Sequence, residues 1–237
     1  MEEQTPGGGR VLKQRVMKAL STGREAAAME VLAGIPPKRL VSPLFGALHR
    51  MEPRTHWTAV RVMGAVVALI AERDMEGARV VIRRMMWNLN DESGGIGWGC
   101  PEAMGEALAR NRGLGEEYTK ILASYTRKDG NFLEHEPLQK GLLWGLVRMA
   151  GVDPVLIKGG RPDAVQFLES PQPVLRGLAA RLAGLARLGE AAPLLRGLLS
   201  DPGEITEDLD GILPSARVRD LAQEALKAVE DYRPDWH

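Results

Sequence analysis

Residues 173–202 read PVLRGLAARLAGLARLGEAAPLLRGLLSDP, and this stretch decides the fold. Its first half repeats leucine and alanine at helical steps of three and four residues, which is the pattern of a helix with one buried face. Gly189 falls where that helix is expected to stop. The stretch therefore predicts two helices, over 172–187 and 190–200, joined by a short turn.

The beginning of this stretch recurs along the chain. The copies begin at Val60, Leu138, Leu175 and Val218. The first two starts lie 78 residues apart, about two repeat lengths, and the later starts follow after 37 and 43 residues. The period is thus close to the ~40 residues of stacked helix pairs. Because a repeat stack grows linearly, we expect residues 1–237 to form a single domain, with a short flexible segment at about 1–9.

Helical periodicity covers nearly the whole chain, and no stretch shows sustained alternation of β-branched and aromatic residues. The sequence therefore predicts an all-α fold. The expected helices cover residues 10–21, 24–33, 38–50, 54–72, 74–89, 101–111, 115–126, 137–149, 161–169, 172–187, 190–200 and 215–231.

Within 173–202 the residues resemble the HEAT-like repeat, whose two helices read V-R-x-x-A-x-x-A-L-G and A-x-P-x-L-x-x-L-L-x-D. The matching positions are Leu175-Arg176, Ala179, Leu182 and Ala192-Pro193-x-Leu195. The likeness covers 173–226 well, 58–70 and 137–150 in part, and the first 50 residues weakly. It implies a right-handed α-solenoid of stacked antiparallel helix pairs, of the HEAT-like or armadillo type, with about five repeats.

Small residues in the first helix of the repeat have a packing role. Ala179, Ala183 and Gly184 would let neighbouring helices approach closely where successive repeats stack. The motif thus specifies architecture, and the function has to be argued from other residues.

Composition excludes several classes of protein. Lysine plus arginine and aspartate plus glutamate number 31 each, so no global positive charge argues for nucleic acid. One cysteine cannot form an internal disulfide, and the start Met1-Glu2-Glu3-Gln4 lacks the basic and apolar regions of a signal peptide. The apolar run at 64–71 is far shorter than the ~20 residues that span a bilayer. We expect a cytoplasmic protein without a membrane segment.

The expected helix at 74–89 carries the first candidate site. Its core stripe is Ala78, Val81, Ile82, Met85 and Leu89. The opposite face then holds Glu76, Arg79, Arg83, Trp87 and Asn90. Tryptophan is mostly buried, and one on an exposed face beside arginines is typical of a recognition surface. The alternative is that Trp87 packs under the loop that follows the helix.

That loop, residues 90–100, reads NDESGGIGWGC and is unusual for a repeat linker. Gly94 and Gly95 belong to a run of glycines that permits positive φ angles and close approach of a ligand. Asp91 and Glu92 add negative charge, and Trp98 adds a stacking surface. The loop therefore predicts a binding element, with a structural plug between two repeats as the alternative. No strand precedes it and no nucleotide-binding glycine motif is present.

Two further side chains are of types that bind metals or act as nucleophiles. His135 precedes Pro137 in the next loop and could approach Asp91 or Glu92 to form a metal site, but no metal-binding spacing supports this, and we favour a surface or cap residue. Cys100 lies at a helix start, which would lower the pKa of its thiol, yet no resolving cysteine or base accompanies it. We expect no catalytic residue, no metal and no cofactor.

The favoured function is a non-enzymatic scaffold that binds a protein partner through its concave face and loop 90–100, with Trp87 and Trp98 as anchors and Arg79 and Arg83 as charged contacts. The alternative rests on similarity of architecture to HEAT-like alkylpurine DNA glycosylases. That resemblance implies that Trp87 and Trp98 would clamp a cationic base while Asp91 stabilises the developing sugar cation. Zero net charge argues against such DNA binding. A lyase or chaperone for a linear tetrapyrrole, as in related HEAT-like repeat families, is a third possibility. Nothing in the sequence besides the repeat motif supports it.

Overall fold

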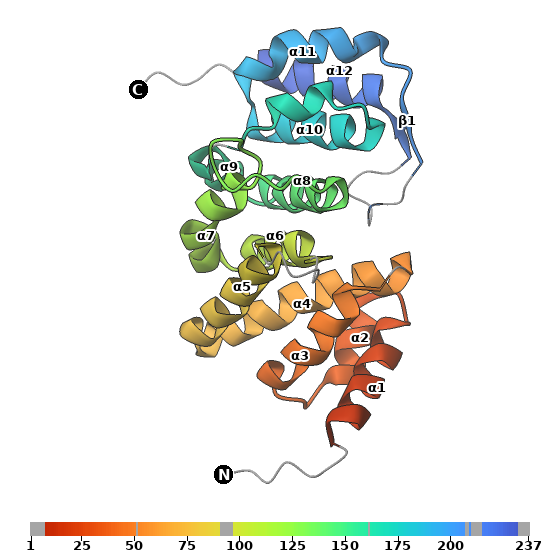
Figure 1. Ribbon diagram of the computed structural model, residues 1–237, viewed down its shortest axis with the longest axis vertical. Coiled ribbons are helices and arrows are strands. Elements are labelled where there is room, and N and C mark those ends of the chain that lie inside the picture. The colour runs from red at the N-terminus through yellow and green to blue at the C-terminus, as the bar shows by residue number, and fades with distance from the viewer. Residues whose placement is uncertain are drawn as a thin grey trace. The chain divides into compact units, whose positions relative to one another are not determined.

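The computed structural model describes residues 8–50, 52–90, 97–160, 162–206, 209 and 215–231 (Figure 1). These residues are mostly helical, and the predicted all-α fold is confirmed. They divide into two compact units, Met1–Asn111 and Arg112–His237, which are described in turn. Residues 1–7 lie outside the described part of the chain, and the first helix begins at Gly8, inside the predicted flexible segment.

Unit 1 is built around its longest helix. Its helices are α1 (Gly8–Leu20), α2 (Glu25–Leu32), α3 (Pro37–Leu48), α4 (Pro53–Arg73), α5 (Met75–Leu89) and α6 (Cys100–Arg110). Helix α4 packs against α3, α5 and α6. Its start is fixed by Glu52, whose carboxylate accepts hydrogen bonds from the backbone N–H groups of Arg54 and Thr55. Asp74 ends α4 and caps α5, accepting a hydrogen bond from Gly77 N.

The contact between α4 and α6 depends on a glycine of the repeated motif. A Cβ atom at Gly64 would lie 3.1 Å from the backbone carbonyl carbon of Glu106 and would overlap that residue's side chain. Glu106 itself is completely buried and is held by Arg61 of α4, at 3.1 Å, and by Arg110, at 2.6 Å. The glycine thus allows close approach, and the arginines neutralise the buried carboxylate.

Unit 2 is built around helix α10 (Pro173–Ala186). Its elements are α7 (Arg112–Ser124), α8 (Glu136–Ala150), α9 (Pro154–Gly160), η1 (Val165–Glu169), α10 (Pro173–Ala186), η2 (Gly189–Ala191), α11 (Ala192–Gly197), η3 (Leu198–Ser200), β1 (Glu204–Ile205), β2 (Ala216–Arg217) and α12 (Val218–Glu230). Helix α10 packs against both α8 and α12. The buried Trp144 of α8 donates its indole N–H to Leu209 O at 2.9 Å.

The predicted role of small residues is confirmed at the contact of α10 with α12. A Cβ atom at Gly184 would lie only 2.8 Å from Cα of Ala225. Ala179 and Ala183 of the same helix are fully buried. The first, apolar position of all four motif copies is also buried, so the periodicity identified the packed face correctly.

The helix predictions fail in the segment before α10. Residues 154–160 form α9, which was not predicted, whereas the expected helix at 161–169 is replaced by a connection and the short 3-10 helix η1. The backbone N–H of Asp163 donates to Thr126 Oγ1 at 2.8 Å, which ties this segment to the end of α7. A second difference is the antiparallel pairing of β1 with β2, which the sequence did not indicate.

Candidate functional site

The exposed face of α5 matches the prediction from periodicity. The predicted core residues Ala78, Val81, Ile82, Met85 and Leu89 are all buried. We call the opposite side the α5 surface and define it as Glu76, Arg79, Val80, Arg83 and Trp87. Trp87 is 75% exposed and Val80 is 55% exposed. The alternative in which Trp87 packs under the following loop concerns residues 91–96, which lie outside the described residues.

The charges of the α5 surface are arranged around one carboxylate. Glu76 lies 3.4 Å from Arg79 Nη1 and 2.5 Å from Arg83 Nη2. The hydrogen bond from Arg83 is the main cause of a lowered pKa for Glu76, so this carboxyl stays ionised at neutral pH. The α5 surface thus carries two guanidinium groups and one carboxylate.

Helix α3 contacts α5 through two side-chain pairs. The Arg84 guanidinium lies 4.2 Å from the ring centroid of Phe45 in α3, a cation–π contact. Lys38, at the start of α3, pairs with Asp74, the cap residue of α5. These two side-chain contacts connect α3 to α5 only through Arg84 and the cap residue Asp74.

The loop 90–100 is described only in part. Asp91, Glu92, Gly94 and Gly95 lie outside the described residues, so their predicted role remains a prediction. Trp98 is partly buried. Gly99 has a φ of 73° and caps α6, as expected of a glycine that turns the chain. A Cβ atom at Gly97 would lie 2.8 Å from Asn88 O, so the end of the loop runs closely against α5.

The metal site that was considered as an alternative at His135 has no support among the described residues. No group of three or more potential ligand side chains occurs there. His135 is exposed and is the N-cap residue of α8, where its carbonyl oxygen accepts from the N–H groups of Leu138 and Gln139. Its proposed carboxylate partners Asp91 and Glu92 lie outside the described segments.

Cys100 differs from the expectation for a thiol at a helix start. Its side chain is fully buried, and burial raises its pKa to about 12. Desolvation of the thiolate outweighs the hydrogen bond from Asn88, which lowers the pKa. A lowered pKa at this position was therefore wrong, and the buried thiol packs as a small apolar group.

Sequence reasoning missed a buried polar cluster in unit 1. Besides its contact with Glu106, Arg110 pairs with Glu25 of α2 at 2.7 Å. Glu102 is also buried, and its Oε1 lies 3.8 Å from His56 Nε2. The cluster ties α2, α4 and α6 together. Only the three-dimensional pairing identifies it, because each residue alone looks like an ordinary surface charge.

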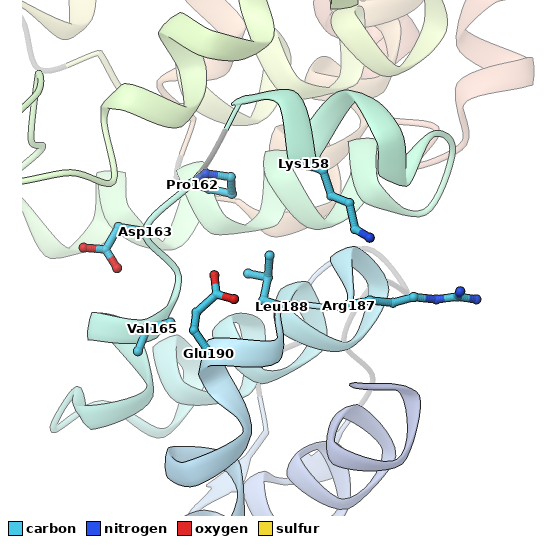
Figure 2. A pocket seen from close by; sticks show the side chains of 7 residues that line it. All are labelled: Lys158, Pro162, Asp163, Val165, Arg187, Leu188 and Glu190. Carbon is cyan, nitrogen blue, oxygen red and sulfur yellow. The ribbon is translucent and has the colours of Figure 1, made fainter. Parts of the chain in front are cut away.

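Unit 2 contains an open pocket of about 660 Å³ that the sequence did not indicate. We call it the unit 2 pocket, and its lining residues are Lys158, Pro162, Asp163, Val165, Arg187, Leu188 and Glu190. Figure 2 shows Lys158 and Arg187 extending to one side, with Asp163 and Glu190 on the other. The residues come from α9, the connection to η1, the first residue of η1, the turn that follows α10, and η2.

Arg187 has an unusual backbone conformation. It follows the last residue of α10 with a φ of 53° and a ψ of 52°, in the left-handed region. Leu188 N donates to Ala183 O at 2.9 Å, which closes the α10 terminus in the pattern where glycine is usual. An L-residue in this conformation costs about 1–2 kcal/mol. Among the described residues other than glycine, Arg187 alone has a positive φ.

Comparison with known proteins supports the fold and leaves the function open. No family model and no curated protein matches the sequence. A crystal structure of an engineered protein aligns with a TM-score of 0.60 at 14% identity, over 95% of this chain and 93% of its own. A designed armadillo repeat protein aligns with a TM-score of 0.55 at 18% identity, over 93% of this chain and 91% of its own.

A second engineered protein gives a TM-score of 0.58 at 13% identity and covers 96% of each chain. At such identities the likeness concerns the fold alone. The predicted all-α repeat fold is therefore confirmed, and a designed armadillo repeat protein is among the structures that share it. No helix in the described part of the chain is both long and apolar enough to cross a membrane.

Proposed function

We propose that this protein is a non-enzymatic scaffold that binds a protein partner through the α5 surface. The observation that carries the proposal is the exposure of Trp87, which leaves 75% of a large aromatic side chain in solvent on a helix whose other face is well packed. Tryptophan and arginine are the residues most enriched among the strong contacts of protein interfaces. Repeat folds commonly present such extended binding surfaces.

The chemistry of the α5 surface defines the partner segment. Trp87 and Val80 offer an apolar contact, and Arg79 and Arg83 bring two guanidinium groups to the same surface as the single carboxylate of Glu76. A segment that carries an apolar or aromatic side chain next to acidic residues complements both features. Loop 90–100 follows α5 directly, and we include it in the proposed interface, with Trp98 as a second anchor.

The test is capture from cell extract with wild-type protein and Trp87→Ala. Trp87 is exposed, so its loss is expected to change the free energy of unfolding by less than about 0.5 kcal/mol. The same change is expected to remove one defined partner, because truncating a central interface tryptophan costs about 2 kcal/mol or more of binding energy. Val11→Ala is the matched control, since Val11 of α1 is 64% exposed and lies outside the α5 surface.

The partner segment is then mapped and synthesised as a peptide, and the peptide is expected to be acidic and to bind in a salt-dependent way. If Trp87→Ala and Val11→Ala retain the same proteins, the α5 surface is not the binding site. Retention of duplex DNA in place of a protein, lost in Trp87→Ala, would likewise overturn the proposal and favour the glycosylase-like alternative.

A further inference from the structure

Positively and negatively charged side chains lie on opposite sides of the unit 2 pocket. Lys158 and Arg187 supply positive charge on one side, and Glu190 supplies negative charge on the other (Figure 2). The apolar side chains of Pro162, Val165 and Leu188 complete the lining between them. Four of the seven lining residues are charged, and placed polar groups beside an apolar surface are what fixes the orientation of a small ligand.

The backbone conformation of Arg187 indicates that the positively charged side of the pocket has a function. The α10 terminus is a position for glycine, yet an arginine adopts the left-handed conformation there and is exposed. Strained residues of this type concentrate at sites of function. A glycine would close the helix with less strain but would remove the guanidinium from the pocket, so ligand binding gives a reason for the arginine.

The acidic side is held in place by hydrogen bonds. Asp163 N donates to Thr126 Oγ1 at 2.8 Å, and Gln166 Nε2 donates to Asp163 Oδ2 at 3.0 Å. Gln166 also donates to Thr126 O. These hydrogen bonds connect the segment between α9 and η1 to the end of α7. The one from Gln166 also satisfies part of the hydrogen-bonding capacity of the Asp163 carboxylate. Glu190 then supplies the exposed negative charge of the pocket.

We propose that the unit 2 pocket binds a small ligand that carries a single carboxylate, held by Arg187 and Lys158, on an apolar body that ends in an ammonium group near Glu190. A guanidinium matches a carboxylate with two parallel hydrogen bonds, and Lys158 adds a point charge. Glu190 disfavours a second anionic group and favours the ammonium. A free amino acid and a short peptide share this chemistry, and a volume of about 660 Å³ admits either.

The experiment is calorimetric titration of the full chain with the tripeptide Ala-Leu-Ala, its C-terminal amide, its N-acetyl form and free leucine. The amide is expected to bind about tenfold or more weakly than the free tripeptide, because the charged hydrogen bonds of the carboxylate are lost. The acetyl form is expected to lose less. Leucine distinguishes the two sources: binding as tight as the tripeptide identifies a free amino acid, and weaker binding identifies a peptide terminus.

The decisive variant is Arg187→Gly, which is expected to raise Tm because it relieves the backbone and to weaken tripeptide binding about tenfold or more. Lys128→Ala is the matched control, because Lys128 is exposed and does not line the pocket. Equal binding by Arg187→Gly and wild type, equal binding of the amide, or no binding at millimolar tripeptide would each overturn the proposal. The pocket lies in unit 2 and its test is independent of Trp87.

Discussion

Arg176 and Asp201 show how one residue pair fixes a repeat. Arg176 Nε and Nη2 donate to the two carboxylate oxygens of Asp201 at 2.7 and 2.9 Å. The two side chains are only 15% and 8% exposed. Arg176 also donates to Ser170 O and Pro171 O, so its charge has further acceptors. The pair connects the start of α10 to the segment that follows η3.

This pair predicts a specific dependence of stability on pH. The hydrogen bond from Arg176 lowers the pKa of Asp201. A carboxyl whose pKa is lowered by folding stabilises the native state above its unfolded pKa of about 3.9, and this contribution is lost as pH falls through the lower native pKa. Asp201→Asn is therefore expected to reduce the free energy of unfolding by about 2–3 kcal/mol at pH 7, with a smaller reduction at pH 3.

Urea denaturation at both pH values measures the effect. The control is Asp220→Asn, because Asp220 is 60% exposed and lies 3.7 Å from Arg219. An exposed pair of this kind contributes about 0–1 kcal/mol. An Asp201→Asn effect that is no larger than the control, or that grows toward acidic pH, would contradict the assigned role of the pair.

At the scale of helices, the close contact of α10 with α12 depends on Gly184. Adding a methyl group there forces the backbone of Ala225 away, so Gly184→Ala is expected to destabilise the fold by about 1–3 kcal/mol. Gly46 in α3 is the matched position, because a Cβ atom there meets nothing within 4 Å. Gly46→Ala is expected to stabilise the fold by up to about 1 kcal/mol, as alanine favours helix.

Thermal unfolding of the two variants shows whether the effect comes from helix propensity or from the close contact of α10 with α12. Opposite signs are expected, since the two substitutions add the same atoms to a helix and differ in what surrounds them. If both variants are stabilised, α10 and α12 are not in the close contact described.

The same scale shows what the sequence could predict. The core stripe of α5 and the exposure of Trp87 followed from periodicity, because a helix of 15 residues repeats its pattern several times. Helix α9 has only seven residues and is too short for such a pattern. Its signal was local: Asp153 Oδ1 accepts from Val155 N at 3.0 Å, and Pro154 follows the acceptor as the first helical residue.

Features that depend on distant residues could not be predicted. The buried cluster of Glu106, Arg61 and Arg110 requires α4 and α6 to be in contact, and the unit 2 pocket requires α9 to lie against the end of α10. Left-handed backbone at Arg187 was also unpredictable, because sequence favours glycine at such a position. The repeat fold could thus be predicted from the motif, whereas the candidate binding residues could be placed on an exposed face only for α5.

At the scale of the whole molecule, the balance of 31 basic and 31 acidic residues hides local differences. The α5 surface in unit 1 carries two guanidinium groups and one carboxylate, and the unit 2 pocket separates opposite charges. The two proposed sites lie in different units of the chain. The organisation of residues 1–237 as one domain remains a prediction, as does the cytoplasmic location.

The central claim is that the exposed indole of Trp87 contacts a partner. Hydroxyl-radical footprinting of the free chain and of the chain with its captured partner tests it directly. Trp87 is 75% exposed and is expected to be oxidised readily in the free chain and protected severalfold in the complex, whereas the fully buried Trp144 serves as an internal reference that stays unreactive in both. Equal oxidation of Trp87 in the two samples would contradict the account.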